Sequence, residues 1–259
     1  MAELPGSPDW VQLTQGALEL GVSLDGGQIA ALERYLDLLI EWNQRFNLTA
    51  IAEPEEVLTK HFLDSLACAR VVDFATQHTL VDVGTGAGFP GMVLKIAFPH
   101  LRLTLLDAIR KRLGFLEHVA AELKLDGVEI LHARAEDVTR PDSQAHSRKG
   151  PPREMPPSHR ERFDVVAARA VARLNVLAEW TLPFAKIGGQ VILMKGPDVK
   201  EEVEEAAHAL SLLGGGPPEV LTLQLPGTDI GRSLVRVPKL RATPRSYPRP
   251  SGIARKSPL

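Results

Sequence analysis

The chain has almost none of the residues that build disulfides, metal centres or membrane spans. It contains a single cysteine, Cys68, among 259 residues, which excludes an internal disulfide and any site built from several cysteines. Its eight histidines include no H-x-x-x-H pair, so we expect no bound metal. It also lacks an apolar run of about 18 residues and a secretory leader, and we therefore expect a cytoplasmic protein without membrane contact.

Length and hydrophobic content bound the domain organisation. With 259 residues, 44% of them hydrophobic, the chain can bury the core of one α/β domain and still carry extensions. Apolar residues at helical spacing predict a helix over 24–46 with Asp25 as its N-cap, and a second over 55–73 in which Cys68 is a buried thiol. We predict a helical cap over 1–75, a core over 76–240 and a basic tail over 241–259.

Seven short apolar runs predict the strands of the core. They lie at 80–82, 101–106, 128–132, 163–168, 190–194, 220–225 and 233–237, and with helices between them they favour a mostly parallel, doubly wound sheet that ends in a hairpin. The proline- and arginine-rich stretch 139–162 has no apolar period and predicts a mobile insert, which either helps to capture RNA or has no function.

A glycine loop follows the first strand and indicates a nucleotide-like cofactor. Asp82 ends the strand, and Gly84, Gly86 and Gly88 follow at alternate positions, where they allow positive φ and close approach of a flat ligand. The same loop also fits the dinucleotide pattern G-x-G-x-x-G. A carboxylate at Asp82 would repel a pyrophosphate but attract the ammonium and sulfonium of S-adenosylmethionine, and we therefore favour the latter over NAD.

A second carboxylate supports a nucleoside ligand. Asp107 ends the second predicted strand about 20 residues beyond the glycines, where Rossmann-like folds bind ribose hydroxyls. Both cofactor interpretations require this residue, so it does not choose between them. We also expect Asp107 to serve as N-cap of a helix over 109–123.

The C-terminal end carries charge of one sign only. From Ile230 onward every charged residue is basic, and Tyr247 and four prolines of the tail lie among the arginines and lysines. These prolines are Pro244, Pro248, Pro250 and Pro258. Prolines favour an extended segment that can follow a phosphate backbone, while Tyr247 offers a stacking face. We expect a polyanionic partner, RNA rather than DNA.

The motifs that the chain lacks reduce the number of base atoms that it could methylate. Exocyclic amines usually need an acid or amide followed by Pro-Pro-aromatic after the fourth strand, but the chain has Ala168-Arg169-Ala170-Val171 there. C5 of a pyrimidine needs a cysteine nucleophile, and Cys68 lies upstream in an apolar helix. A ring nitrogen such as N7 of guanine needs neither group, and Arg169 or Arg173 could orient the base through its O6.

Several motifs together resemble one bacterial family. The residues that carry the resemblance are Trp42-Asn43, Asn47-Leu48-Thr49-Ala50, His61-Phe62-Leu63-Asp64-Ser65, the loop from Asp82 to Gly91, Arg169-Ala-Val-Ala-Arg173 and Thr243-Pro-Arg-Ser-Tyr-Pro-Arg249. This ordered set is similar to the glucose-inhibited division protein B family, also called ribosomal RNA small subunit methyltransferase G. The long insert at 139–162 departs from the family pattern.

The resemblance implies a Rossmann-like, S-adenosylmethionine-dependent methyltransferase that transfers a methyl group to N7 of a guanine in 16S small-subunit rRNA. It implies that the cofactor lies against Gly84, Phe89, Asp107, Ala108, Ala135, Glu136 and Arg169, and that Lys195 contacts RNA. We add Asp82, Gly86 and Gly88 to the cofactor set, and Arg173, Arg245, Tyr247, Arg249 and Lys256 to the RNA set. We expect a monomer that binds 16S rRNA or the small ribosomal subunit.

Two other functions stay open at this point. A non-catalytic RNA-binding ribosome-assembly factor would keep the fold and the tail, and an NAD-dependent oxidoreductase would keep the glycine loop. The trio His61, Asp64 and Ser65 invites comparison with a catalytic triad, but no G-x-S-x-G elbow is present. We expect a hydrogen-bonded cluster on one helix beside the cofactor instead.

Overall fold

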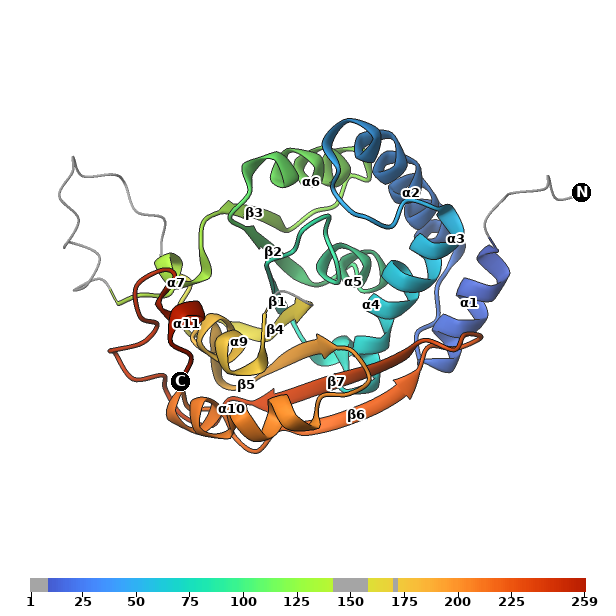
Figure 1. Ribbon diagram of the computed structural model, residues 1–259. Helices are drawn as coiled ribbons and strands as arrows, with labels where there is room; N and C mark the ends of the chain where they lie inside the picture. The colour runs from blue at the N-terminus through green and yellow to red at the C-terminus, as the bar shows by residue number, and fades with distance from the viewer. Residues whose placement is uncertain (1–8, 142–157, 170–171) are drawn as a thin grey trace, which may run out of the picture.

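A seven-stranded sheet forms the centre of the molecule. The computed structural model describes residues 9–141, 158–169 and 172–259. The strands are β1 (Thr79–Val83), β2 (Arg102–Asp107), β3 (Val128–His132), β4 (Phe163–Arg169), β5 (Ala185–Lys195), β6 (Glu219–Gln224) and β7 (Gly231–Pro238), in the order β3-β2-β1-β4-β5-β7-β6 (Figure 1). β1 to β5 pair in parallel, whereas β7 is antiparallel to both β5 and β6. The predicted sheet with its terminal hairpin is confirmed.

Helices cover both faces of the sheet. They are α1 (Trp10–Glu19), α2 (Gly26–Phe46), α3 (Pro54–Val57), α4 (Asp64–Leu66), α5 (Gly91–Ala97), α6 (Arg110–Glu122), α7 (Ala135–Val138), α9 (Leu174–Thr181), α10 (Lys200–Leu212) and α11 (Ile253–Lys256). Two separate hydrophobic cores result, because successive strand residues point to opposite faces. Leu80 belongs to the core under α2, α5 and α6, and Val81 to the core under α9 and α10.

The N-terminal cap is helical as predicted, but its second helix is not continuous. Helix α2 begins after Asp25, whose side chain accepts from the amide of Gln28 in a capping box. The predicted helix over 55–73 is instead α3, a π-helical turn over Leu58–Leu63, α4 and a 3₁₀ turn over Ala67–Arg70. Such π-turns are frequent at functional sites, and this one carries His61. Cys68 is buried as expected, and burial raises the pKa of its thiol.

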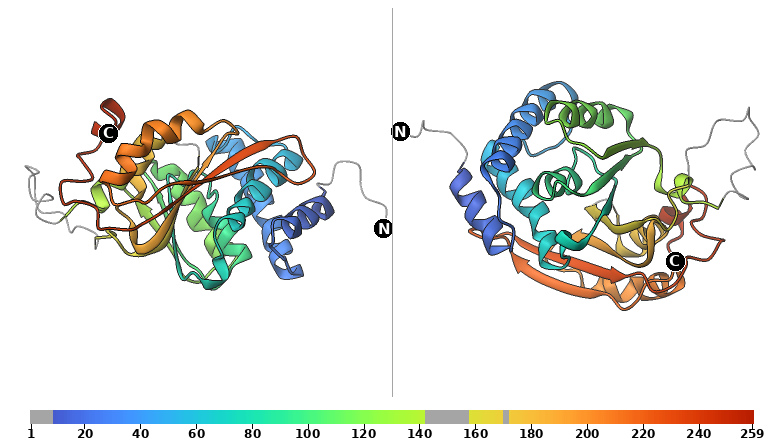
Figure 2. Two further views of the ribbon diagram at one scale, coloured as in Figure 1. Left: turned by 90° about the horizontal axis from the view of Figure 1, so that it is seen from below. Right: turned by 180° about the vertical axis from the view of Figure 1, so that it is seen from behind.

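The tail (residues 241–259) is packed against the core, so the expectation of an extended segment is wrong. It forms turns and the short helix α11, and Thr243 and Ala254 are buried. Arg160 explains part of this folding, because its guanidinium donates to the carbonyls of Thr243 (2.5 Å) and Tyr247 (2.8 Å). Figure 2 shows the tail and the cap helices α1 and α2 at opposite ends of the molecule.

Part of the predicted insert lies outside the described residues. These omit 142–157, the centre of the stretch 139–162, and also omit Ala170 and Val171. The two ends of the predicted insert belong to the fold, since Thr139 and His159 are buried. Within the described part of the chain, no helix combines the length and apolarity needed to cross a membrane.

Candidate functional site

The glycine loop takes the backbone conformation that its sequence predicts. Gly84, Gly86 and Gly88 have φ of 74°, 62° and 104°. The loop is tied to the neighbouring strand, because the amide of Gly84 donates to the carbonyl of Leu106 at 2.8 Å. A Cβ on Gly88 would lie 2.9 Å from Cδ2 of Leu116, so only glycine fits there. The loop follows β1 where the strand order reverses, which is the usual ligand position in such sheets.

Asp82 lies beneath this loop and holds it. The side chain is fully buried, and its Oδ2 accepts from Thr85 Oγ1 at 2.7 Å and from the amide of Gly91 at 2.9 Å. The other oxygen, Oδ1, is buried with no hydrogen-bond partner among the described residues. Burial raises the pKa of Asp82 to about 6. Asp82 lines neither of the cavities described below, so its predicted contact with the cofactor stays a prediction.

Asp107 ends β2 and faces a cavity. Its Oδ2 accepts from the amide of Gly86 at 3.0 Å and from Arg112 at 3.3 Å. Its Oδ1 accepts from the amide of Ile109 at 2.8 Å. The expected N-cap role is wrong, because α6 begins one residue later and its N-cap, Ile109, has no side-chain hydrogen bond. Asp107 therefore stiffens the turn before α6 and links it to the glycine loop.

Cavity A, of about 300 Å³, collects five of the ten predicted cofactor residues. It is lined by Val83, Gly84, Leu106, Asp107, Ala108, Ile109, Arg112, Ala133, Arg134, Ala135, Glu136, Trp180 and Arg255. Gly84, Asp107, Ala108, Ala135 and Glu136 come from the ends of β1, β2 and β3, as parallel pairing of these strands requires. Trp180 and Arg255 were not predicted, because no local pattern distinguishes them from other residues.

Cavity B, of about 210 Å³, adjoins cavity A through Gly84 and Arg112, which line both. Its other lining residues are Leu48, Thr49, His61, Thr85, Gly86, Ala87, Phe89 and Arg169. It brings the predicted Gly86, Phe89 and Arg169 together with the Thr49 and His61 of the cap. Gly88 lines neither cavity; it packs against Tyr35 and Leu116.

Arg169 is held on one wall of cavity B. Its NH1 donates to the carbonyl of Lys60 at 3.1 Å and to Oδ2 of Asp64 at 3.2 Å. Its guanidinium carbon lies 5.0 Å from the centre of the Phe89 ring. These contacts fix the charged group at the end of β4, next to the glycine loop.

His61 lies between Arg169 and Thr49. Its ring stacks on Phe89 with centres 4.3 Å apart, and its Nε2 is 3.0 Å from Thr49 Oγ1. Its Nδ1 lies 3.1 Å from Arg169 NH2 and 3.0 Å from the carbonyl of Lys60. Nδ1 can either accept from the Arg169 guanidinium or donate to the carbonyl of Lys60, because the first group only donates and the second only accepts. Burial and the charge of Arg169 lower the pKa of His61 to about 3, which favours a neutral ring.

No catalytic triad is present at this position. Asp64 is buried and paired with Arg169 and Arg232, and burial raises its pKa in spite of the two arginines. Ser65 Oγ donates to the backbone carbonyl of His61 at 2.6 Å, not to its ring. The expected hydrogen-bonded cluster beside the loop is confirmed, although Asp64 is buried and not on the helix surface.

The predicted RNA residues do not form one surface. Arg173 is exposed and paired with Glu205, and it lines neither cavity A nor cavity B. Lys195 is mostly buried and pairs with Glu202 at 2.7 Å. In the tail, Tyr247 is half-buried and Arg249 pairs with the buried Glu179, whereas Arg245 and Lys256 are exposed.

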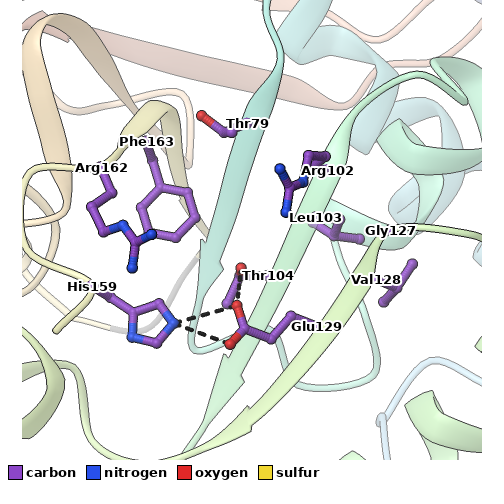
Figure 3. A pocket seen from close by; sticks show the side chains of 10 residues that line it. All are labelled: Thr79, Arg102, Leu103, Thr104, Gly127, Val128, Glu129, His159, Arg162 and Phe163. Carbon is purple, nitrogen blue, oxygen red and sulfur yellow. Dashed lines mark hydrogen bonds and ion pairs between the residues drawn. The ribbon is translucent and has the colours of Figure 1, made fainter. Parts of the chain in front are cut away.

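A larger cavity lies at the opposite ends of the strands from cavities A and B. Cavity C, of about 460 Å³, is lined by residues at the amino ends of the strands, among them Thr79, Arg102 and Glu129 (Figure 3). Glu129 accepts from Thr104 Oγ1 at 2.8 Å and contacts His159 Nε2 at 3.2 Å. Ligands of such sheets bind at the carboxyl ends of the strands, so the larger volume of cavity C does not make it the functional site.

Comparison with known proteins shows which family the chain is similar to. The model of the family described as rRNA small subunit methyltransferase G matches residues 28–228. The ribosomal RNA small subunit methyltransferase G of Alkaliphilus metalliredigens is 45% identical over 247 residues, which cover 95% of this chain and 97% of that protein. Its namesake from Desulforamulus reducens is 45% identical over 249 residues, which cover 96% and 98%.

A solved structure shares the fold at low sequence identity. It is an S-adenosylmethionine-dependent O-methyltransferase from Thermotoga maritima, with a TM-score of 0.50, 16% identity and coverage of 80% of this chain and 72% of that one. The fold is thus the Rossmann-like fold of S-adenosylmethionine-dependent methyltransferases. With the match of the family model and the two close relatives, we conclude that the chain belongs to the rRNA small subunit methyltransferase G family.

Proposed function

We propose that this protein transfers a methyl group from S-adenosylmethionine to N7 of a guanine in 16S small-subunit rRNA. One observation carries the proposal: cavities A and B adjoin each other around the glycine loop, in a chain of this family. The comparisons lend no support to an oxidoreductase or to a non-catalytic assembly factor. The rRNA substrate supports a cytoplasmic location, and the monomer stays a prediction.

The residues of the two cavities suit the parts of the cofactor. Cavity A offers the Asp107 carboxylate for a ribose diol and the small side chains of Ala108 and Ala135 for a flat base. Cavity B offers the bare backbone of Gly86 and the guanidinium of Arg169, which suit the amino-acid end. When bound, the cofactor supplies an electrophilic methyl group on a sulfonium.

The protein contributes orientation and exclusion of water, not proton transfer. N7 of guanine carries its own lone pair, so no base is needed at the target atom. The titratable groups beside cavity B agree with this, because His61, with a pKa lowered to about 3, is a weak base and Asp64 is engaged by two arginines. Arg169, fixed over Phe89, remains the candidate for positioning the base.

RNA binding needs exposed cations near the cavities. Arg245 and Lys256 of the tail are exposed and supply such charges, and Arg173 before α9 is exposed although it pairs with the exposed Glu205. Arg249 and Lys195 are engaged by Glu179 and Glu202, so we assign them weaker roles in RNA binding. Tyr247 keeps a partly exposed ring for stacking.

Two measurements test the proposed function. Calorimetric titration with S-adenosylhomocysteine should give micromolar binding that Asp107→Asn weakens about tenfold or more, because a carboxylate–hydroxyl bond is lost. Asp37→Asn, an exposed acid on α2, is the matched control, and NADH is the control ligand. Incubation with S-adenosylmethionine and 16S rRNA, followed by borohydride and aniline cleavage, should then reveal one N7-methylated guanine. Binding without any methyl transfer would contradict the enzyme assignment.

A further inference from the structure

The tail closes one side of cavity A. Arg255, on α11, and Trp180, near the end of α9, line this cavity together with Asp107, Ala135 and Glu136. The guanidinium carbon of Arg255 lies 5.0 Å from the centre of the Trp180 ring, and α11 packs against α9. A cavity that consisted of the strand ends alone would be open on this side.

Strong contacts hold the tail in this place. Arg249 donates from its backbone amide (2.6 Å) and from NH2 (2.6 Å) to the two carboxylate oxygens of Glu179, which is 1% exposed. Next to α11, the amide of Gly252 donates to Oε1 of Glu136 at 3.3 Å, and Ser251 Oγ donates to Asp137 at 3.3 Å. Glu136 thus belongs both to cavity A and to the attachment of the tail.

The wall made by Trp180 and Arg255 has the chemistry of an adenine site. An indole and the guanidinium above it form a planar, cationic and largely apolar surface, which favours a flat heteroaromatic ring. The Nε1–H of Trp180 is buried, and within the described residues it has no hydrogen-bond acceptor. A free ring nitrogen of adenine only accepts hydrogen bonds, so it would supply the acceptor that this N–H lacks.

We propose that Trp180 and Arg255 bind the adenine of S-adenosylmethionine and that the folded tail is therefore part of the cofactor site. This inference rests on the proposed function, and it adds two binding residues to it. It also links the tail's exposed cations to the cofactor, since Arg245 and Lys256 belong to the same segment as Arg255. Disorder of the tail should weaken cofactor binding as well as RNA binding.

Calorimetry with two ligands tests the two residues. S-adenosylhomocysteine spans both cavities, whereas 5′-methylthioadenosine has the adenine and ribose but lacks the amino-acid end. Arg255→Ala and Trp180→Leu should each weaken both ligands by about three- to thirtyfold, the range of a desolvated cation–π contact. Arg241→Ala is the matched control, because Arg241 is an exposed arginine of the same tail that does not line cavity A. It should leave both affinities within about twofold.

Tryptophan fluorescence gives a second readout and uses a more conservative variant than Trp180→Leu. The chain has three tryptophans, and Trp10 and Trp42 lie in the helical cap. Saturation with S-adenosylhomocysteine should change the emission of the wild-type protein, and the change should be absent in Trp180→Phe, which keeps an aromatic ring. Thermal melts followed by circular dichroism check that each variant is folded.

The outcomes separate the two proposals. Tight binding by the wild type with unchanged affinities in folded Arg255→Ala and Trp180→Leu would overturn the adenine site and leave the proposed function intact. A ligand-induced emission change that persists in Trp180→Phe would overturn it as well. If the wild type binds neither ligand, the proposed function fails and takes this inference with it.

Discussion

Arg169 and Asp64 are 105 positions apart in the chain, yet NH1 of the arginine lies 3.2 Å from Oδ2 of the aspartate. The other oxygen of Asp64 accepts from Nε of Arg232 at 2.9 Å. One buried carboxylate thus connects α4 of the cap, the end of β4 and the start of β7. Asp64 is the carboxylate that pairs with Arg169 on the wall of cavity B, where the carbonyl of Lys60 and the Phe89 ring also hold the guanidinium.

Asp64→Asn should therefore weaken both the fold and the reaction. The neutral amide has a single acceptor oxygen, so both arginines lose the opposite charge and one of them also loses its hydrogen-bond acceptor. We expect a loss of about 1 to 3 kcal/mol in the free energy of unfolding. Methyl transfer should fall because Arg169 is released from its position. Urea unfolding and initial rates with 16S rRNA measure the two effects. Arg34→Ala, which breaks the exposed pair with Glu122, should leave both unchanged.

Asp82 should make stability depend on pH. Burial raises the pKa of this carboxyl from its ordinary 3.8 to about 6, so the folded protein holds a proton that the unfolded chain releases between those values. The stability contributed by Asp82 is therefore highest below pH 4 and is lost as the pH rises through 6. Asp82→Asn should be more stable than the wild type by up to about 3 kcal/mol at pH 8.

Urea unfolding at pH 4 and pH 8 is the measurement for this residue. The advantage of Asp82→Asn should be small at pH 4, where the wild-type carboxyl is also neutral. An equal difference at both pH values would show that ionisation of Asp82 is not the cause. If Asp82→Asn also weakens S-adenosylhomocysteine, the buried charge is maintained for the cofactor at a cost in stability.

Arg249→Gln should destabilise the tail more than it weakens RNA binding. The substitution leaves the carboxylate of Glu179 buried without its charged partner, and such a loss is typically about 3 to 5 kcal/mol. The double variant Glu179→Gln with Arg249→Gln should recover much of that stability, since no unpaired charge remains. Thermal melts compare the three proteins. Lys256→Gln, at an exposed lysine of the same tail, should lower RNA affinity and its salt dependence with little effect on the melting temperature.

Gly88→Ala and Gly86→Ala form a matched pair within the glycine loop. Both residues have positive φ, so each substitution is strained by roughly 1 to 2 kcal/mol. The Cβ on Gly88 would also press against Leu116 and Met92, whereas the Cβ on Gly86 would meet no protein atom. Gly88→Ala should therefore lower the melting temperature further. Gly86→Ala should mainly weaken S-adenosylhomocysteine, because its methyl group would stand in cavity B. Equal melting temperatures would contradict this distinction.

The glycine loop, the acid at the end of each of the first two strands and the alternating order of strands and helices were predictable from the sequence. These features are local: a glycine needed for positive φ, a carboxylate at a strand end and an apolar period each depend on a few neighbouring residues. Ala135 and Glu136 followed only from the family resemblance, because nothing in their short segment distinguishes them from an ordinary helix start.

The tertiary structure decided which charged side chains form ion pairs within the fold and which are exposed to solvent. The sequence determined a basic tail, but whether Arg249 faces solvent depends on Glu179, 70 positions earlier, and the path of the tail depends on Arg160. Trp180 and Arg255 meet at cavity A only because α9 and α11 pack together. A local sequence pattern indicates the backbone conformation of a segment and which of its residues are buried. Which distant side chains pair is decided only when the chain packs, and this packing brought the tail to cavity A.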